Sequence, residues 1–274
     1  MRRYTDDVNK LMTEPNVSSL AELYHENSKL RKISWRQYGE FVSLITSIPH
    51  VVEKMARSCK SYPTASQIAL PDHFEPNGPS LETVIQKRRT LREFSGRPLV
   101  LDEIARLLHF SYGVTGSAAI SQQATQRQFF RAAPSAGALY PLEIYLVVWN
   151  VVGLEPGIYH YHTINGVLEC LKQGDFCEIV GEYTISKDLV EKACVLCLVT
   201  AVFQRTMFKY QERGYRFVLL DAGHMAQNMC LMAAAMNLGI IPIGAFLDDE
   251  LNRLLGIDGV NESVIYPLLV GRAG

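Results

Sequence analysis

The stretch RAAPSAGALYPLEIYLVV, residues 131–148, decides the fold class of this chain. Small residues between Pro134 and Pro141 predict a tight loop, and the apolar run that follows (142–150) predicts a buried strand. A loop of Ser, Ala and Gly lets backbone amides approach a planar ligand closely. An ordinary turn has the same composition, so the spacing by itself leaves both interpretations open.

More strands and helices follow on both sides of this loop. GIYHYHTINGVLECL (157–171) is two apolar runs joined by Asn165-Gly166, the strongest short hairpin signal. Three further apolar runs predict buried strands: 193–203, 240–246 and 263–271. Helices are expected at 81–89 with Ser80 as N-cap, at 101–113, near 175–183, and at 248–256. This order predicts an α+β fold with a layered sheet.

The longest helical pattern runs from about Tyr215 to Leu238. It is apolar on nearly every face, and Gly239 is the expected stop. A helix of this kind belongs in a core or at a subunit interface, so we expect a homodimer.

A Pro/Ser/Asn-rich stretch, 61–80, predicts a linker and the main boundary in the chain. Residues 1–75 are therefore interpreted as a helical N-terminal extension with its linker, and 76–274 as the sheet domain. Within the extension, helices are expected over 18–35 and 42–59, the second broken near Pro49.

Composition limits the classes of partner. The 274 residues are 48% hydrophobic and 20% charged, with 27 basic and 28 acidic side chains and a net charge of -1. Long-range attraction to nucleic acid or anionic lipid therefore has no source, and no run reaches the roughly 18 apolar residues of a membrane span. The first 16 residues lack the apolar core of a signal peptide, so a cytoplasmic location is expected. The six cysteines are interpreted as reduced core thiols.

The segment KRRTLREF (87–94) is a candidate phosphate site. Arg88 and Arg89 beside Thr90 match a phosphate monoester, because guanidinium forks and a hydroxyl donate to its oxygens. A basic helix end is also favoured by the helix dipole, which is the competing interpretation. Two more candidates are the small-residue strand end with Gly244 and Ala245, and Arg272 near the C-terminus.

In order and spacing these segments resemble the FMN-binding elements of the nitroreductase superfamily, over residues 80–274. The resemblance implies that Arg88, Arg89, Thr90 and Arg272 hold the FMN phosphate and ribitol. It implies that Pro134, Ser135 and Ala136 reach the flavin from the partner subunit of a homodimer, and that the amides of Gly244 and Ala245 lie near the flavin ring. The implied fold is a central, mostly antiparallel sheet flanked by helices.

Within that superfamily, PSAGALYP is similar to the signature of the SagB-type, McbC-like azoline dehydrogenases. YHENSKL (24–30) and GYRFVLLDAGHMAQN (214–228) extend the resemblance over nearly the whole chain, with Asp221 where the subfamily more often has glutamate. The resemblance implies oxidation of peptide thiazoline or oxazoline rings to thiazole or oxazole, with O2 as electron acceptor, and cyclodehydratase partner proteins.

The dipeptide Lys209-Tyr210 matches the catalytic Lys-Tyr pair of that subfamily. Ring desaturation also requires a base or proton relay, and a buried lysine beside a phenol can supply one because burial lowers the lysine pKa. Without the resemblance, two surface residues on an amphipathic turn are the simpler interpretation.

Other signals are assigned to structure. Cys194 and Cys197 are three residues apart in a predicted strand and therefore face opposite sides, which favours core packing over a metal or redox pair. His160-x-His162 has no evident third ligand, so no metal site is expected. No dinucleotide-binding glycine motif, Walker loop or Ser-His-Asp order is present. Two alternatives stay open: an NAD(P)H-dependent reductase of nitro compounds or quinones, and a flavin-loaded structural subunit of a modification complex.

Overall fold

A computed structural model describes residues 19–56, 59–75, 78–120, 127–184 and 187–274. The chain divides into two compact units, Met1–Leu44 and Ile45–Gly274. The first 18 residues of the predicted helical extension lie outside the described residues.

The first unit carries helix α2 (Leu20–Asn27) and the beginning of α3 (Lys32–Ser47). Ser19 caps α2, because its hydroxyl accepts a hydrogen bond of 3.1 Å from the amide of Glu22. One helix was expected over 18–35, but α2 ends at Asn27 and α3 starts separately. The predicted break near Pro49 is confirmed: α4 (Pro49–Ala56) begins at this proline, whose missing N–H is no loss in a first helical turn.

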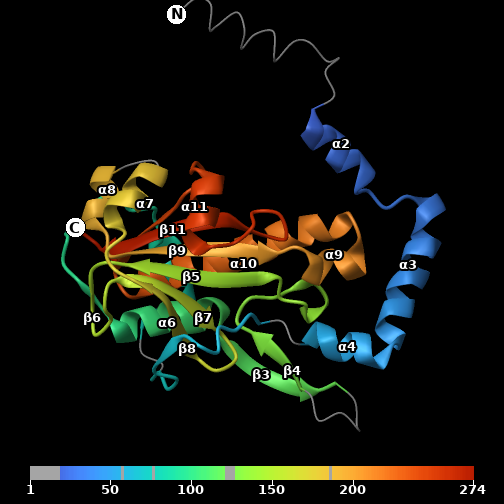
Figure 1. Cartoon of the computed structure of the whole chain (residues 1–274), viewed down its shortest axis with the longest axis horizontal. Helices are drawn as coiled ribbons and strands as arrows, with labels where there is room; N and C mark the ends of the chain where they lie inside the picture. Colours follow the sequence, from blue (N-terminus) through green and yellow to red (C-terminus); the bar gives the residue numbers. More distant parts are fainter. Residues whose placement is uncertain (1–18, 57–58, 76–77, 121–126, 185–186) are drawn as a thin grey trace, which may run out of the picture. The chain divides into compact units, whose positions relative to one another are not determined.

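The second unit is built on a seven-stranded sheet, and every neighbouring pair is antiparallel (Figure 1). In spatial order the strands are β1 (Ser66–Ala69), β8 (Val167–Gln173), β7 (Gly157–His162), β5 (Leu142–Val148), β9 (Val195–Val202), β11 (Glu262–Arg272) and β10 (Leu238–Pro242). The antiparallel α+β sheet and the 157–173 hairpin are therefore confirmed.

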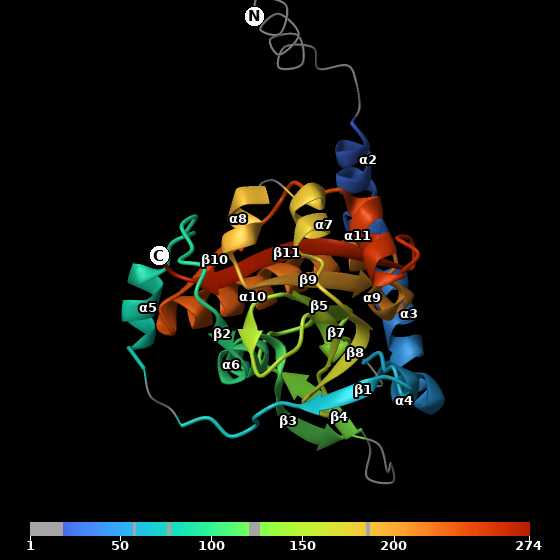
Figure 2. The same cartoon turned by 60° about the vertical axis from the view of Figure 1, so that its left-hand side comes forward.

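Helices cover both faces of the sheet, which explains why its central strands are apolar without interruption. Alternate residues of β5 point to opposite sides: Ile144 and Leu146 pack in one core, Tyr145 and Val147 in the other. Helices α6 (Leu101–Tyr112) and α10 (Arg213–Ala235) form the first core with the sheet. Helices α7 (Cys177–Tyr183), α8 (Lys187–Lys192) and α11 (Asp248–Leu255) form the second (Figure 2). Each fully buried aliphatic side chain contributes about 1.5–3 kcal/mol to this layered packing.

Short elements complete the unit. They are α5 (Leu81–Lys87), capped by Ser80 as expected, β2 (Leu99–Val100) with β6 (Val151–Val152), the hairpin of β3 (Val114–Ala119) and β4 (Arg127–Arg131), a 3-10 turn (Ala136–Ala138), and α9 (Gln204–Tyr210). The stretch interpreted as a linker contains β1, which pairs with β8 at the edge of the sheet. Part of that stretch thus belongs to the sheet, and the domain boundary between residues 75 and 76 stays a prediction.

Helix α10 differs from its prediction in two respects. It ends at Ala235, and the left-handed turn is made by Asn237 (φ 55°), so the expected stop at Gly239 is wrong; Gly239 already belongs to β10. Leu219 and Leu220 are 47% and 56% exposed, so burial on every face does not occur within one chain.

All six cysteines are free, three of them buried and three half-buried. Among the described residues, none of the helices combines the length and the hydrophobicity that a membrane span requires.

Candidate functional site

The loop between Pro134 and Pro141 has a strained backbone. Gly137, Ala138 and Tyr140 adopt φ values of 63°, 53° and 45°, in the left-handed region that L-residues other than glycine avoid. For Ala138 and Tyr140, strain of this kind costs about 1–3 kcal/mol per residue and persists only where the surroundings hold it in place, whereas Gly137 adopts such a φ without strain. The surrounding structure therefore holds this loop in a conformation that an ordinary turn does not need.

Two hydrogen bonds through Ser135 hold this loop. The Ser135 hydroxyl accepts from the amide of Tyr140 (2.9 Å) and donates to the carboxyl Oδ2 of Asp221 on α10 (2.5 Å). The loop is thus attached to the long helix, and the hydroxyl of Ser135 is already engaged within the chain. Pro134 is exposed, whereas Ser135 and Ala136 are half-buried.

Asp221 is 3% exposed and lies among apolar residues of α10. Burial raises the pKa of its carboxyl to about 6, while the hydrogen bonds from Ser135 and from the backbone of Ala136 oppose this rise. The carboxyl therefore changes protonation state close to neutral pH.

Lys209 and Tyr210 meet this loop at Gly137. A β-carbon placed on Gly137 would lie 2.5 Å from the Tyr210 hydroxyl and 3.0 Å from Lys209 Nζ, so the two polar groups converge on the bare backbone of the glycine. Lys209 is only 9% exposed, and burial lowers its pKa. Its Nζ lies 5.2 Å from the centre of the Tyr210 ring. The structure thus joins the predicted Lys-Tyr pair to the predicted small-residue loop.

Arg205, one turn earlier on α9, fixes the position of that helix. Its Nη2 forms an ion pair of 2.5 Å with Glu143 on β5, and its Nη1 donates to the carbonyl of Tyr140 (3.3 Å). Burial would raise the pKa of Glu143, but Arg205 and then His160 outweigh it and hold that pKa at about 2. Helix α9 is therefore tied to both the sheet and the strained loop.

A row of buried polar groups continues from Glu143 across the sheet. His160 lies between two carboxylates, 2.9 Å from Glu143 and 2.8 Å from Glu169. On the other side, Thr200 donates to Glu262, which also pairs with Lys60 at 2.6 Å. Among the described residues, no group of His, Cys, Asp or Glu has the arrangement of a metal site.

The predicted phosphate-binding residues lie in a different part of the domain. Arg88 and Thr90 are half-buried and Arg89 is exposed, in the segment that follows α5. This segment runs beside the end of β11, because the Ser95 amide donates to the Arg272 carbonyl (3.0 Å) and Phe94 pairs with Ala273. The structure therefore brings residues 88–90 and Arg272 to one end of the sheet.

Arg272 does not offer its guanidinium to a ligand in this arrangement. Its two terminal nitrogens bind both carboxylate oxygens of Glu103, at 2.7 and 2.9 Å. Gly244 and Ala245 are exposed in the turn after β10, and a β-carbon on Gly244 would contact nothing within 4 Å. Backbone amides at this turn are accessible to a ligand.

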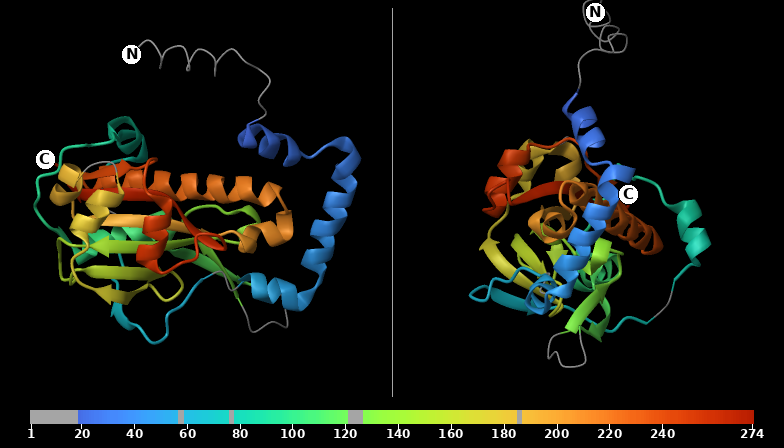
Figure 3. Two further views of the ribbon diagram at one scale, coloured as in Figure 1. Left: turned by 45° about the horizontal axis from the view of Figure 1, so that its top comes forward. Right: turned by 90° about the vertical axis from the view of Figure 1, so that its right-hand side faces the viewer.

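Helix α10 separates the two groups of candidate residues. Lys209 and Tyr210 precede its first turn, whereas Arg272 pairs with Leu238, directly after its last turn. The helix has 23 residues, which corresponds to about 35 Å at about 1.5 Å per residue. Figures 1 and 3 show the same separation, with α9 at one end of α10 and the C-terminus near the other. One chain therefore does not bring all the predicted site residues together.

Sequence reasoning missed the contributions of Arg205 and Glu143. Arg205 stands in no motif, and Glu143 is a lone charge in the apolar strand 142–148, the one signal that could have drawn attention to it.

The comparison with known proteins agrees with this architecture. Residues 85–272 match the model of the nitroreductase family. A Methanocaldococcus jannaschii protein named as a nitroreductase is 37% identical over 216 residues, which cover 76% of this chain and 96% of that protein.

Two bacterial processing proteins are also similar. The trifolitoxin-processing protein TfxB of Rhizobium leguminosarum bv. trifolii is 28% identical, over 82% of this chain and 60% of its own length. The microcin B17-processing protein McbC of Escherichia coli is 30% identical, over 51% and 52%. The chain thus spans somewhat more than half the length of these two relatives.

Among solved structures, the Escherichia coli microcin synthetase McbBCD complex with truncated pro-MccB17 bound has a similar fold. The TM-score is 0.57 at 20% identity, covering 90% of this chain and 98% of the other. From the family match and the 37% identical relative, together with TfxB and McbC, the chain belongs to the nitroreductase family of oxidoreductases and has McbC-like proteins among its relatives.

Proposed function

We propose that this protein is a cytoplasmic, FMN-dependent dehydrogenase that oxidises thiazoline or oxazoline rings in a peptide to thiazole or oxazole. The observation that carries the proposal is the convergence of Lys209 Nζ and the Tyr210 hydroxyl on Gly137. A reductase that only passes electrons to small acceptors has no need for a buried amine and a phenol at one backbone position.

The described residues fit a flavin mononucleotide. Arg88, Arg89 and Thr90 supply cations and a hydroxyl for its phosphate, and the open turn at Gly244 and Ala245 offers backbone amides. Arg272 lies at the same end of the sheet, where its guanidinium is paired with Glu103. When bound, FMN would accept a hydride from the ring and pass the electrons on to molecular oxygen.

Removal of the proton from the ring is assigned to side chains of the protein itself. Aromatisation removes two hydrogens from the azoline ring, one as a hydride and one as a proton. The lowered pKa of Lys209 increases the share of its free amine at neutral pH, and the free amine can accept that proton. Tyr210, with its hydroxyl beside the same glycine, can pass the proton towards solvent because it is half-buried.

We further propose that the site is shared across a homodimer. The phosphate-binding residues lie at one end of α10 and the Lys-Tyr pair at the other, about 35 Å away, which is farther than one FMN molecule reaches. A second copy of the chain can bring its own Pro134–Ala136 loop, with Lys209 and Tyr210, to the flavin of the first. The exposed Leu219 and Leu220 on α10 give such a dimer an apolar contact.

The names of the relatives support a proposal about partners. TfxB and McbC are named as processing proteins of trifolitoxin and microcin B17, and the McbBCD complex holds a truncated precursor of microcin B17. By analogy we propose a ribosomal peptide as substrate and cyclodehydratase proteins as partners of this chain.

A second candidate, an NAD(P)H-dependent reductase of nitro compounds or quinones, is favoured by one observation. The 37% identical relative, which the chain covers almost completely, carries the name nitroreductase. In that case the Lys-Tyr pair would have a structural role.

Anaerobic mixing of the flavin-loaded protein with a synthetic thiazoline peptide, and separately with NADPH, distinguishes the two. The dehydrogenase predicts bleaching of the flavin by the peptide, with formation of the thiazole. Bleaching by NADPH alone would favour the reductase, and bleaching by neither would favour a flavin-loaded structural subunit.

A further inference from the structure

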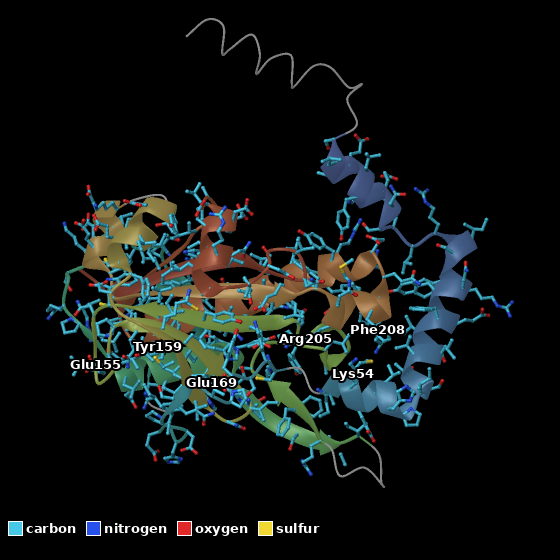
Figure 4. All side chains as sticks on the ribbon, in the orientation of Figure 1. Lys54, Glu155, Tyr159, Glu169, Arg205 and Phe208 are labelled. Atoms are coloured by element: carbon cyan, nitrogen blue, oxygen red, sulfur yellow. The ribbon has the colours of Figure 1, made fainter. Side chains whose placement is uncertain are left out.

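A cleft of about 650 Å³ opens between helices α4 and α9. Its walls include Val51, Lys54 and Met55 of α4, and Val202, Arg205 and Phe208 at and before α9. Figure 4 shows Lys54, Arg205 and Phe208 in one region of the domain. The volume lies within the range of ligand-binding clefts in proteins.

The cleft has an apolar body and a positive rim. No acidic side chain is among its lining residues, whereas Lys54, Arg205 and the imidazole of His50 are. The charge of Arg205 is balanced by Glu143, at 2.5 Å. Lys54 is exposed and makes no ion pair within the described parts of the chain, so it is the cation that remains available. An apolar ligand with a negative charge is the complement of these walls.

One wall of the cleft is formed by α9, the helix that also carries the Lys-Tyr pair. Arg205 and Phe208 are three residues apart and therefore share the face of α9 that lines the cleft. Lys209, the next residue, turns to the strained loop, where its Nζ approaches Gly137. Arg205 also bonds to the carbonyl of Tyr140 in that loop. A molecule whose reacting ring sits at Lys209 can thus reach the cleft within one helical turn.

We propose that this cleft holds the peptide segment flanking the azoline ring, with an apolar side chain against Phe208 and Met55 and an acidic side chain paired with Lys54. This rests on the proposed function, because it places the substrate's own chain beside the reacting ring. A free azoline ring cannot fill both places at once, whereas an extended peptide can. The enzyme therefore selects peptides with an acidic and an apolar residue close to the ring.

The test measures binding apart from turnover. Two labelled synthetic thiazoline peptides, identical except for Leu-Glu or Leu-Lys beside the ring, are titrated with the flavin-loaded protein in a fluorescence anisotropy assay at low salt. The wild type should bind the Glu peptide about fivefold more tightly, as expected for one exposed ion pair. Lys54→Glu should reverse this preference.

Lys192→Glu, on α8, is the matched control, because it makes the same charge change at an exposed position away from the cleft. It should keep the wild-type preference. Phe208→Ala should weaken both peptides by a similar factor. Equal affinities for the two peptides, or a preference unchanged in Lys54→Glu, would overturn the proposal.

The two proposals fail differently. If the charge preference behaves as expected but no ring is oxidised, the cleft assignment stands and the dehydrogenase proposal is wrong. If a capped thiazoline without flanking residues is oxidised normally and the peptides show no charge preference, the cleft assignment alone is wrong.

Discussion

The hydroxyl of Tyr210 lies 2.5 Å from the place that a β-carbon on Gly137 would occupy, so a larger residue at this position of the loop would have to displace the phenol. The same glycine has φ 63° and approaches Lys209 Nζ. The bare backbone of this glycine therefore leaves the space that the proposed proton acceptor and its neighbouring phenol occupy.

We expect Gly137→Ala to abolish azoline oxidation while the flavin stays bound. The new methyl group must displace Tyr210 and Lys209, and the left-handed backbone costs about 1–2 kcal/mol in addition. Gly166→Ala is the matched control, because Gly166 has φ 64° but nothing within 4 Å of its β-carbon position. Denaturant unfolding should show a similar loss of stability in both variants, with normal turnover in the control. Normal turnover by Gly137→Ala would show that the approach of Lys209 and Tyr210 to this glycine is not needed for catalysis.

Arg205→Met should destabilise the fold by about 3–5 kcal/mol, because it leaves the carboxylate of Glu143 buried without its ion-pair partner. The double variant Arg205→Met/Glu143→Gln should recover much of that loss, since the buried charge is removed as well. Urea unfolding of the two single variants and the double variant measures the coupling. Additive effects would show that this ion pair does not hold α9 to the sheet.

The stability of the protein should depend on pH through Asp221. Its pKa rises from 3.8 to about 6 on folding, so the folded state binds the extra proton between these values. The stabilisation is complete below about pH 4 and is lost as the pH rises through 6, by about 3 kcal/mol at most. In Asp221→Asn this loss should disappear, because the amide does not titrate in this pH range. The amide oxygen can still accept the hydrogen bond from Ser135, so the loop should stay attached to α10. Unfolding free energies of both proteins at pH 4.5 and 7 check this; an identical pH dependence would contradict it.

Replacing Arg88 and Arg89 together with alanine should remove most of the flavin, which is identified as FMN after denaturation. Arg253→Ala/Lys192→Ala removes two exposed positive charges elsewhere and should keep it. Full flavin occupancy in the first variant would refute this phosphate site.

The same variant tests whether the site is shared between subunits. Mixed with Lys209→Ala/Tyr210→Phe under conditions of subunit exchange, it should form heterodimers with one intact site each. About a quarter of wild-type activity should then return in an equimolar mixture, whereas sites built within one chain would give none.

Much of the fold could be predicted because periodic apolar runs report burial directly. The 157–173 hairpin followed from Asn165-Gly166, and the strand at 142–148 from an apolar run that only a sheet covered on both faces explains. Strand β1 was missed, since only Ile68 of its four residues is partly buried and the sheet edge gives no alternation to detect.

The candidate site could be predicted only in pieces. The sequence identified the loop and the Lys-Tyr pair, yet their meeting at Gly137 depends on a left-handed backbone that no local pattern reveals. The ion pair of Arg205 with Glu143 joins residues that are 62 positions apart in the sequence, since 205 minus 143 is 62. Two isolated charges at such a separation do not predict a contact.

The most direct test of the account is the rate at which a thiazoline peptide reduces the bound flavin under anaerobic conditions, compared between the wild type, Lys209→Ala and Tyr210→Phe. Tyr183→Phe, at another half-buried tyrosine, serves as the control. We expect each site variant to lose about 100- to 10,000-fold, the usual contribution of a positioned acid or base, while reduction by dithionite and FMN content stay at wild-type values. Wild-type rates with the peptide in the double variant Lys209→Ala/Tyr210→Phe would contradict the central claim and make the pair structural.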